Sequence, residues 1–411
     1  MALLAYSPVA LLQAMTGRRA LGDIRGRLGA GPYPDLGGGI WIHAVSVGEV
    51  GVARNLLAQL AQRAPARRLG VSVTTAAGRE LARRSLGEKA AVFPFPFDLA
   101  RPVENALSQT RPGLILLTET ELWPLFLERA ATRGIPVALV NGRLSDRSWR
   151  RYSLARRYLS KVLRGISMFA MQTEKDAERM RSLGAPAERV RVTGNIKYDL
   201  LPALPFPDAD RLRRAAAGRP ILAAASTAEG EEEIVLDAWE KLSPRPLLVL
   251  APRRPERFGP AARRIEERGH RLARRNGASS DGADVYLLDS VGELASLYRE
   301  AAVVFLGGSL VPKGGHNPIE SWAAGVPVIV GPHTHNFEEV MRRGKELDIL
   351  RVTGGREELS RAIGEALADP KGTSARGARA ERFVSENRGA AASTAELVLP
   401  LLAGAPRRRA P

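Results

Sequence analysis

A glutamate stands directly after the first strongly apolar segment of the chain that is followed by a clear helical pattern. In IHAVSVGEV (residues 42–50), the apolar run ends at a turn containing Ser46 and Gly48, and Glu49 follows at the expected start of a helix. A carboxylate held at a strand end can act as a general base, and the positive end of a helix favours its ionised form. The alternative is a first-turn glutamate that only stabilises its own helix.

A second group of residues, in the other half of the chain, suits an anionic ligand. In RPILAAASTAEGEEE (residues 219–233), Ser226 and Thr227 close an apolar strand and are expected to open a helix whose free N–H groups can hold an anion. The alternative is an ordinary Ser/Thr N-cap followed by acidic first-turn residues. In LVLAPRRPERF (residues 248–258), Arg253 and Arg254 follow the next strand, where a guanidinium can bind a phosphate through two parallel hydrogen bonds.

The most specific segment is glycine-rich and reads VVFLGGSLVPKGGHNPIESWAAGVPVIVGP (residues 303–332). Its glycines allow the backbone to approach a ligand closely, and a helix is expected to begin at about Asn317 or Pro318. Glu320 then lies in the first turn, where its carboxylate can accept hydrogen bonds from both hydroxyls of a ribose. The segment therefore predicts a nucleotide site.

Two patterns that could indicate a metal are better explained in other ways. Asp208-Ala209-Asp210 resembles a metal-binding DxD motif, but it lies just before an expected helix and is interpreted as capping. The five histidines show no i, i+4 pairing of the kind that zinc sites use, and the absence of cysteine excludes disulfides, zinc fingers and thiol catalysis. We expect neither a metal nor a cofactor.

The elements that must position these residues follow an alternating pattern. Short aliphatic segments, each followed by an amphipathic stretch, predict strands at 40–45, 71–75, 114–118, 136–140, 168–172 and 190–193, and then at 221–225, 247–251, 284–288, 303–306 and 327–330. After Glu49, residues Val50, Ala53, Leu57 and Leu60 fall on one helical face. This alternation is typical of parallel sheets with crossover helices, in which ligands bind at the carboxyl ends of the strands.

The domain organisation follows from length and from one proline-rich break. A chain of 411 residues exceeds what one hydrophobic core usually organises, and LLPALPFPDAD (residues 200–210) interrupts both periodicities. We expect an α/β protein of two doubly wound domains with a cleft between them. The expected parts are an N-terminal apolar and basic segment (1–35), a first domain (36–200), a linker (201–210), a second domain (211–385) and a C-terminal helix with a basic tail (386–411).

The charge of the chain points to anionic partners without choosing among them. A net charge of +17 attracts nucleic acid, anionic lipid head groups or phosphorylated substrates, although part of it can be compositional bias on solvated faces. No window of about 20 apolar residues predicts a transmembrane helix. The apolar residues 1–15 contain Pro8 and are followed by arginines, an arrangement that suits an interfacial segment better than a signal peptide, whose charge precedes its apolar run.

Eight motifs, in order along the chain, resemble the Kdo transferases of lipopolysaccharide assembly, which use the acidic sugar 3-deoxy-D-manno-octulosonic acid (Kdo). They are HAVSVGE, TETELWP, NGRLSDRS, VTGNIKYD, STAEGEEE, APRRPERF, DSVGELASLY and GGHNPIESWAAGVPVIVGPHTHNF. The resemblance implies two facing Rossmann-like domains of the GT-B type with an interdomain cleft, and a glycosyltransferase that needs no metal and inverts the anomeric centre. It implies CMP-Kdo as donor, a phosphorylated tetraacyl lipid A precursor (lipid IVA) as acceptor, and a place on the cytoplasmic face of the inner membrane, peripheral or monotopic.

The same resemblance assigns roles to individual residues. Glu49 matches the general base of the family, and Glu119 and Lys197 match groups that assist the transition state. The positions that match the CMP site are Pro252, Arg253, Val291, Gly292, Glu293, Asn317, Pro318, Ile319 and Glu320, and Ser226 is the anion-binding candidate described above. Val291 replaces a frequent methionine, Arg254 replaces a frequent histidine, and NGRLS replaces the usual NARLS.

Two other functions remain open on the sequence alone. The fold would equally suit a related transferase or epimerase that uses a UDP-sugar. A basic nucleic-acid-binding protein is the other alternative, although the sequence has no zinc finger and no RNP-type aromatic motif.

Overall fold

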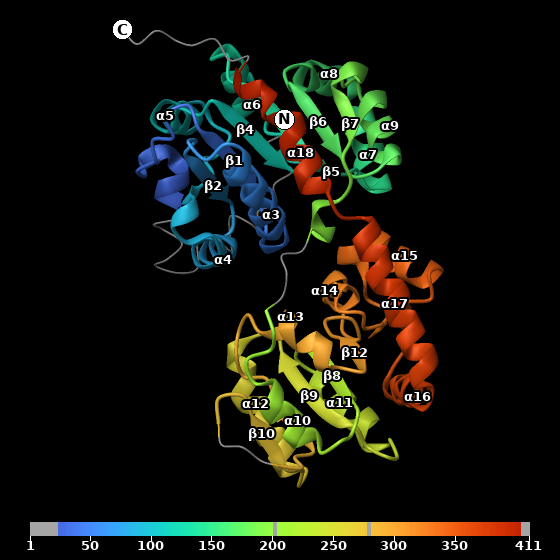
Figure 1. Cartoon of the computed structure of the whole chain (residues 1–411). Coiled ribbons are helices and arrows are strands. Elements are labelled where there is room, and N and C mark those ends of the chain that lie inside the picture. Colours follow the sequence, from blue (N-terminus) through green and yellow to red (C-terminus); the bar gives the residue numbers. More distant parts are fainter. Residues whose placement is uncertain (1–23, 200–203, 278–280, 404–411) are drawn as a thin grey trace. The chain divides into compact units, whose positions relative to one another are not determined.

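The computed structural model describes residues 24–199, 204–277 and 281–403, which form two compact units (Figure 1). Unit 1 comprises residues 1–199 together with 387–411, and unit 2 comprises residues 200–386. Each unit contains one parallel sheet of seven strands with helices around it. This confirms the predicted α/β fold of two Rossmann-like domains.

The sheet of unit 1 has the strand order β3-β2-β1-β4-β5-β6-β7. Its strands are β1 (Ile40–Ala44), β2 (Leu69–Val73), β3 (Ala91–Pro94), β4 (Leu114–Thr118), β5 (Val137–Gly142), β6 (Met168–Met171) and β7 (Val190–Val192). The central strands β1, β2, β4 and β5 are buried along their whole length, because helices cover both faces of a parallel sheet. The chain order reverses between β1 and β4, and such a reversal opens a crevice at the carboxyl ends of the two strands.

The helices of unit 1 enclose two apolar cores, one on each face of the sheet. They are α3 (Val47–Arg63), α4 (Ala76–Leu86), α5 (Ala100–Thr110), α6 (Pro124–Thr132), α7 (Asp146–Leu154), α8 (Arg156–Arg164) and α9 (Glu174–Ser182), with α18 (Ala390–Val398) and α19 (Pro400–Ala403) from the C-terminal part. The predicted face of α3 is confirmed, because Val50, Ala53, Leu57 and Leu60 are all buried in one core.

The sheet of unit 2 repeats this arrangement in the order β10-β11-β9-β8-β12-β13-β14. Its strands are β8 (Ile221–Thr227), β9 (Leu247–Pro252), β10 (Leu272–Arg274), β11 (Val285–Leu287), β12 (Val303–Leu306), β13 (Val328–Val330) and β14 (Leu350–Val352). The reversal lies between β8 and β12, so the loops that follow these two strands meet at one edge of the sheet.

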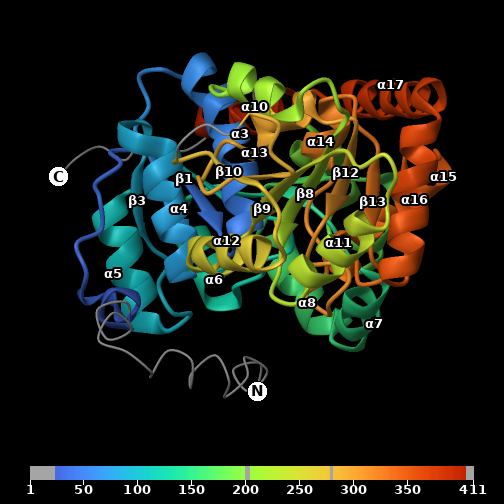
Figure 2. The same ribbon diagram turned by 90° about the horizontal axis from the view of Figure 1, so that it is seen from below.

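Eight helices accompany the sheet in the described part of unit 2. They are α10 (Ala209–Ala216), α11 (Glu231–Glu240), α12 (Phe258–Glu267), α13 (Leu294–Leu297), α14 (Ile319–Ala323), α15 (Glu338–Glu346), α16 (Arg356–Ala368) and α17 (Pro370–Glu386). Helices α16 and α17 contact each other, and α17 also contacts α14, as the group of orange and red helices in Figure 2 illustrates. The glycine-rich loop therefore runs from β12 to the short helix α14, which packs against α17.

The two ends of the chain both contribute to unit 1. Of the predicted N-terminal segment (1–35), residues 1–23 lie outside the described residues, and Tyr33 is buried in a core of unit 1. At the other end, α18 packs against α3, and the carboxylate of Asp199 accepts hydrogen bonds from the backbone N–H groups of Gly389 and Ala391. The predicted basic tail (404–411) also lies outside the described residues. Throughout the described ranges, every helix is too short or too polar to traverse a bilayer.

Candidate active site

Glu49 is a buried carboxylate at the point where β1 leads into α3. Only 7% of the residue is exposed, and its two oxygens are held by three donors. The backbone N–H of Val45 donates to Oε2 (2.9 Å), the hydroxyl of Ser46 donates to Oε1 (2.9 Å), and the hydroxyl of Thr118 lies 2.7 Å from Oε2. Thr118 ends β4, so the carboxylate spans the crevice between β1 and β4 in unit 1. A first-turn glutamate that served only its helix would have no need of these partners.

The contact between Thr118 and Glu49 suits a group that gains and loses a proton. The Thr118 hydroxyl lies 2.8 Å from the carbonyl oxygen of His43 and 2.7 Å from Oε2 of Glu49, but it has only one proton to donate. When Glu49 is ionised, Thr118 can donate to it, and when Glu49 is protonated, it can donate to Thr118 while Thr118 donates to His43. Burial, together with the charge of Glu119, raises the pKa of Glu49, and the three hydrogen bonds partly oppose this rise.

Glu119 and Lys197, which lie far apart in the sequence, form an ion pair in unit 1. Their Oε1 and Nζ atoms are 2.7 Å apart, each side chain is 16% exposed, and Arg143 adds a second cation 3.4 Å from Oε2 of Glu119. The backbone of Glu119 has a positive φ of 57°, so the chain leaves the extended conformation of β4 at this residue. The structure therefore brings together all three residues that were predicted to be catalytic.

Asn141, which the sequence analysis did not single out, positions Lys197. Its Oδ1 accepts a hydrogen bond from the backbone N–H of Ile196 (2.9 Å), and the side chain of Asn55 donates to the carbonyl of Ile196 (3.3 Å). Asn195 then accepts a hydrogen bond from the N–H of Lys197 (3.0 Å) and fixes the turn. These three asparagines hold the segment that carries the lysine against the carboxyl end of β5.

Glu121 is a third carboxyl group beside Glu49 and Glu119, and it too was not predicted. It lies two residues after Glu119 in TETELWP and is only partly exposed. Burial, with the negative charges of Glu49 and Glu119, raises the pKa of Glu121 from its ordinary value of 4.5 to about 8. A carboxyl group with this pKa is mainly protonated at neutral pH.

In unit 2, the structure corrects the expected geometry around Ser226. Strand β8 does end at Thr227, but α11 begins at Glu231, and its N-cap is Gly230 rather than Ser226 or Thr227. The chain makes an additional turn because Ser226 and Gly230 both have positive φ, 54° and 90°. Ser226 therefore lies at the carboxyl end of β8 and not at a helix N-terminus, so neither the anion site formed by helix N–H groups nor the Ser/Thr N-cap is present there.

The N–H groups at this edge of the sheet are instead occupied by a carboxylate of the protein. Glu231 is fully buried, and its oxygens accept hydrogen bonds from the backbone N–H groups of Ala228, Gly308, Ser309 and Leu310 at 2.6–2.9 Å. Three of these donors are consecutive residues of the glycine-rich loop after β12. Glu231 therefore fixes the start of that loop across the crevice between β8 and β12.

The rest of the glycine-rich loop is held by its own backbone and by the segment GPHTHNF. Gly315 N–H donates to the carbonyl of Gly308 (2.7 Å), and the side chain of Asn336 donates to the carbonyl of Lys313 (3.0 Å). Gly314 has φ 91°, and a β-carbon there would collide with the side chain of Asn336. The loop needs glycine at this position for both reasons.

The predicted nucleotide residues at the end of this loop lie near Arg253. Helix α14 begins at Ile319, with Pro318 as N-cap, slightly later than the predicted start at Asn317 or Pro318. The side chain of Asn317 accepts a hydrogen bond from the N–H of Ile319 (3.2 Å). Burial, reinforced by the charge of Arg253, lowers the pKa of His316 to about 4, so this histidine is neutral at pH 7. The guanidinium of Arg253 is exposed and follows Pro252 at the end of β9.

The third predicted nucleotide segment precedes α13. Val291 is 69% exposed, and Gly292 has φ 94°. Glu293 is engaged within the protein, because both of its oxygens accept hydrogen bonds from Arg275 at 2.9 Å. Glu293 is therefore held by Arg275, whereas Val291 is exposed to solvent.

Asp208 does not cap α10 through its side chain, which corrects the interpretation of Asp208-Ala209-Asp210. It occupies the N-cap position, but no side-chain capping bond is formed. Its carboxylate instead accepts a hydrogen bond from the Tyr286 hydroxyl (2.5 Å) and lies 3.6 Å from a guanidinium nitrogen of Arg211. The end of the predicted linker is therefore tied to β11.

Comparisons with known proteins identify the family of the chain. Residues 22–200 match the family model described as 3-deoxy-D-manno-octulosonic-acid transferase (kdotransferase). A 3-deoxy-D-manno-octulosonic acid transferase of Haemophilus influenzae is 38% identical over 378 residues, which cover 89% of this chain and 87% of the relative. One of Bordetella pertussis is 36% identical over 394 residues, 90% of this chain and 89% of the relative. The chain belongs to the 3-deoxy-D-manno-octulosonic acid transferase family.

The Kdo transferase family membership confirms the predicted enzyme class. The chain is a glycosyltransferase, and this replaces the alternatives of a UDP-sugar enzyme and of a nucleic-acid-binding protein. Among solved structures, the glycosyltransferase of kitacinnamycin matches with a TM-score of 0.55 and 16% identity, covering 90% of this chain and 100% of that chain. At this identity the match supports the two-domain GT-B fold alone.

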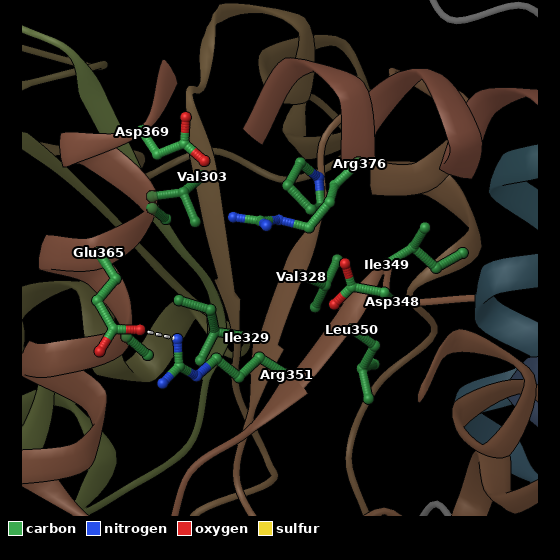
Figure 3. Close-up of a pocket in the computed structure, with 13 residues that line it drawn as sticks. Val303, Val328, Ile329, Asp348, Ile349, Leu350, Arg351, Glu365, Asp369 and Arg376 are labelled. Carbon is green, nitrogen blue, oxygen red and sulfur yellow. Dashed lines mark hydrogen bonds and ion pairs between the residues drawn. The ribbon is translucent and has the colours of Figure 1, made fainter. Parts of the chain in front are cut away.

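A cavity of this Kdo transferase lies away from the residues just described. It has a volume of about 520 Å³ and is lined by Val303, Val328 and Leu350, which are the first residues of β12, β13 and β14 (Figure 3). These are the amino ends of the strands, whereas the candidate site lies at the carboxyl ends. The side chains of Arg351 and Glu365 form an ion pair at its wall. None of the predicted site residues lines this cavity.

The pKa of Glu121 makes a testable prediction about the stability of the Kdo transferase. Between pH 4.5 and about 8 the folded chain retains the proton of Glu121 while the unfolded chain has lost it, so this group lowers stability as the pH rises through that window. We expect Glu121→Gln, which cannot ionise, to be more stable than the parent at pH 8.5, with the difference shrinking toward pH 5. Urea unfolding at the two pH values measures this.

The matched control for this prediction is Glu128→Gln. Glu128 is also a glutamate and lies seven positions after Glu121 in the sequence, but it is exposed to solvent on α6. We expect its substitution to leave the pH dependence of the parent unchanged. Equal pH dependence of Glu121→Gln and the parent would show that Glu121 ionises normally in the folded chain.

Proposed function

We propose that the chain transfers Kdo from CMP-Kdo to a sugar hydroxyl of a phosphorylated lipid A precursor in lipopolysaccharide biosynthesis, with inversion at the anomeric carbon. The observation that carries this proposal is the position of Glu49. A buried carboxylate with a raised pKa, held by three donors at the crevice between β1 and β4, has the properties of a general base.

In this mechanism the proton and the electron pairs move as follows. The acceptor hydroxyl gives its proton to Glu49, and its oxygen forms a bond with the anomeric carbon of Kdo. The bond between that carbon and the phosphate oxygen of CMP breaks on the opposite face, and CMP leaves with the electron pair. Lys197, held by Glu119, supplies positive charge for the carboxylate of Kdo or for the departing phosphate.

In the proposal, unit 2 binds the nucleotide. The exposed guanidinium of Arg253 binds the phosphate, and the segment from Asn317 to Glu320 binds the ribose. Ser226 contributes through its place at the carboxyl end of β8, and Pro252 and the segment from Val291 to Glu293 contact the rest of CMP. His316 is neutral at pH 7 and adds no positive charge for the phosphate, so the proposal assigns this role to Arg253. The mechanism requires that both units bind the two substrates together.

The enzyme of this proposal works at the cytoplasmic surface of the inner membrane, because its acceptor is a lipid. Attachment is peripheral and uses the positive charge of the chain, with the predicted N-terminal segment (1–35) as a further contact.

The proposed function predicts a specific product and a specific nucleotide. Incubation with CMP-Kdo and a tetraacylated, phosphorylated acceptor should increase the acceptor mass by that of one or more Kdo residues, and NMR of the product should show the inverted anomeric configuration. CMP should raise the unfolding midpoint, because a ligand at 100 times its dissociation constant stabilises the folded state by about 2.7 kcal/mol. UDP, the control, should shift it far less. An equal shift by UDP, or no mass increase, would contradict the proposed donor.

A further inference from the structure

Helices α7 and α8 of unit 1 form a strongly basic surface. Residues 147–164 contain seven cationic side chains and no acidic one, which gives this segment a charge of +7. All seven are exposed: Arg147, Arg150, Arg151, Arg156, Arg157, Lys161 and Arg164. The two helices follow each other in the chain and contact each other, and Figure 2 shows them as neighbours.

The cations of this surface lack acidic partners, unlike many other arginines in the described part of the chain. Among the described residues, none of the seven forms an ion pair. By contrast, Arg179 on the adjacent α9 pairs with Asp146, and Arg268 in unit 2 pairs with both Asp237 and Glu240. The positive charge of α7 and α8 is therefore uncompensated and available to an external anionic partner.

Two apolar side chains protrude from the same surface. Leu154, the last residue of α7, is 91% exposed, and Tyr158 on α8 is 54% exposed. On its inner side, α8 is anchored to unit 1 by the buried Leu159 and Leu163. The fold therefore explains the inner face of α8 but gives Leu154 nothing to pack against. A leucine and a tyrosine exposed among cations are residue types that an interfacial helix can present to an anionic bilayer.

The basic surface is close to the acceptor side of the candidate site. Helix α7 follows the loop that carries Arg143, which pairs with Glu119. Burial and the negative charge of Glu121 raise the pKa of Tyr152 on α7, so this tyrosine lies within electrostatic range of Glu121. A lipid acceptor has to enter the site from its bilayer, so a membrane contact is expected near this part of unit 1.

We propose that α7 and α8 dock unit 1 onto an anionic phospholipid bilayer, with the cations over the phosphate head groups and Leu154 and Tyr158 entering the interface. The inference deepens the proposed peripheral attachment and rests on it. A nucleic acid would meet the same cations, but it offers no apolar layer for Leu154. The bilayer is therefore the partner that uses both features of the surface.

The test is co-sedimentation of the full chain with vesicles of phosphatidylcholine alone and of phosphatidylcholine with 30% phosphatidylglycerol. Each cation near an anionic leaflet contributes roughly fivefold to binding. Arg150→Glu combined with Arg157→Glu should therefore reduce partitioning onto the anionic vesicles by about 25-fold or more. Leu154→Ser should reduce it by at least about fivefold without changing the charge. Neutral vesicles should bind all variants weakly.

The matched control reverses two exposed, unpaired cations on α17 of unit 2, Lys371→Glu with Arg382→Glu. It has the same change in net charge and should retain most of the binding. All variants should keep the parent's thermal midpoint and its transfer rate with acceptor dispersed in detergent, because none of these residues belongs to the candidate site.

Each outcome decides a separate question. If the control loses as much binding as the α7–α8 double variant, net charge alone drives attachment and the surface has no special role. If both α7–α8 variants bind vesicles like the parent but lose affinity for a duplex oligonucleotide, the partner is a nucleic acid and the inference is overturned. If the parent itself does not bind anionic vesicles, the proposed attachment fails together with the inference, while the transfer assay still decides the proposed chemistry.

Discussion

Replacement of Glu49 by glutamine is expected to slow Kdo transfer by about 10²- to 10⁴-fold, which is the usual effect of losing a positioned general base. Glutamine has nearly the same shape and can still accept hydrogen bonds through its amide oxygen, but it cannot take a proton from the acceptor hydroxyl. The effect should appear in kcat. It should not appear in CMP binding, because the proposed nucleotide site belongs to unit 2.

The controls for this variant separate lost chemistry from lost structure. Glu80→Gln removes an exposed carboxylate on α4 that pairs only with Arg84, and it should transfer at the parental rate. The thermal shift of Glu49→Gln with CMP should equal that of the parent. Near-normal transfer by a purified, folded Glu49→Gln enzyme would show that Glu49 is not the general base, and this would contradict the proposed mechanism.

The central strands could be predicted from the sequence, whereas the strands that were not predicted lie at the edges of the sheets. Strands β3, β10 and β14 each end a sheet, are only three or four residues long, and each contain just one buried residue. An edge strand is covered on fewer sides, so its sequence needs no long apolar run. The predicted strands such as β4, which is buried throughout, carry that run because helices cover both of their faces.

The residues of the candidate site could be predicted, but not the hydrogen bonds that connect them. Thr118 reaches Glu49 across 69 positions of sequence, and Asn141 reaches Ile196 across 55. These contacts depend on the register between neighbouring parallel strands, such as His43 beside Leu117 in β1 and β4. No local pattern encodes that register, so the partners of Glu49 and Lys197 became evident only in the folded chain.

The glutamates after Ser226 illustrate a further limit of sequence patterns. The segment EGEEE offers several equivalent acidic residues, and the first-turn interpretation treats them alike. In the structure, Glu231 is fully buried, Glu232 is buried against Arg257, and Glu233 lies at the surface with Arg264. The additional turn at Gly230 determines which glutamate points inward. The sequence pattern does not distinguish these three glutamates, whereas the conformation of this turn does.

Glu231→Gln is expected to lower the free energy of unfolding of unit 2 and to weaken CMP binding. A carboxylate accepts all four backbone N–H donors of Ala228, Gly308, Ser309 and Leu310, whereas an amide offers one accepting oxygen and turns its NH2 group toward the other donors. Hydrogen bonds to a charged group contribute about 1.5–3 kcal/mol each, so a loss of about 3–5 kcal/mol is expected in urea unfolding.

The loss of CMP affinity distinguishes a positioning role of Glu231 from a purely structural one. Displacement of the loop from Gly308 to Leu310 should move the segment from Asn317 to Glu320, and the CMP dissociation constant should rise on the order of tenfold, which corresponds to about 1.4 kcal/mol. Glu233→Gln on the same helix is the matched control, because its carboxylate is half-exposed and contacts no loop backbone. If Glu231→Gln is less stable but its folded fraction binds CMP as tightly as the parent does, the buried carboxylate supports the fold of unit 2 without positioning the nucleotide loop.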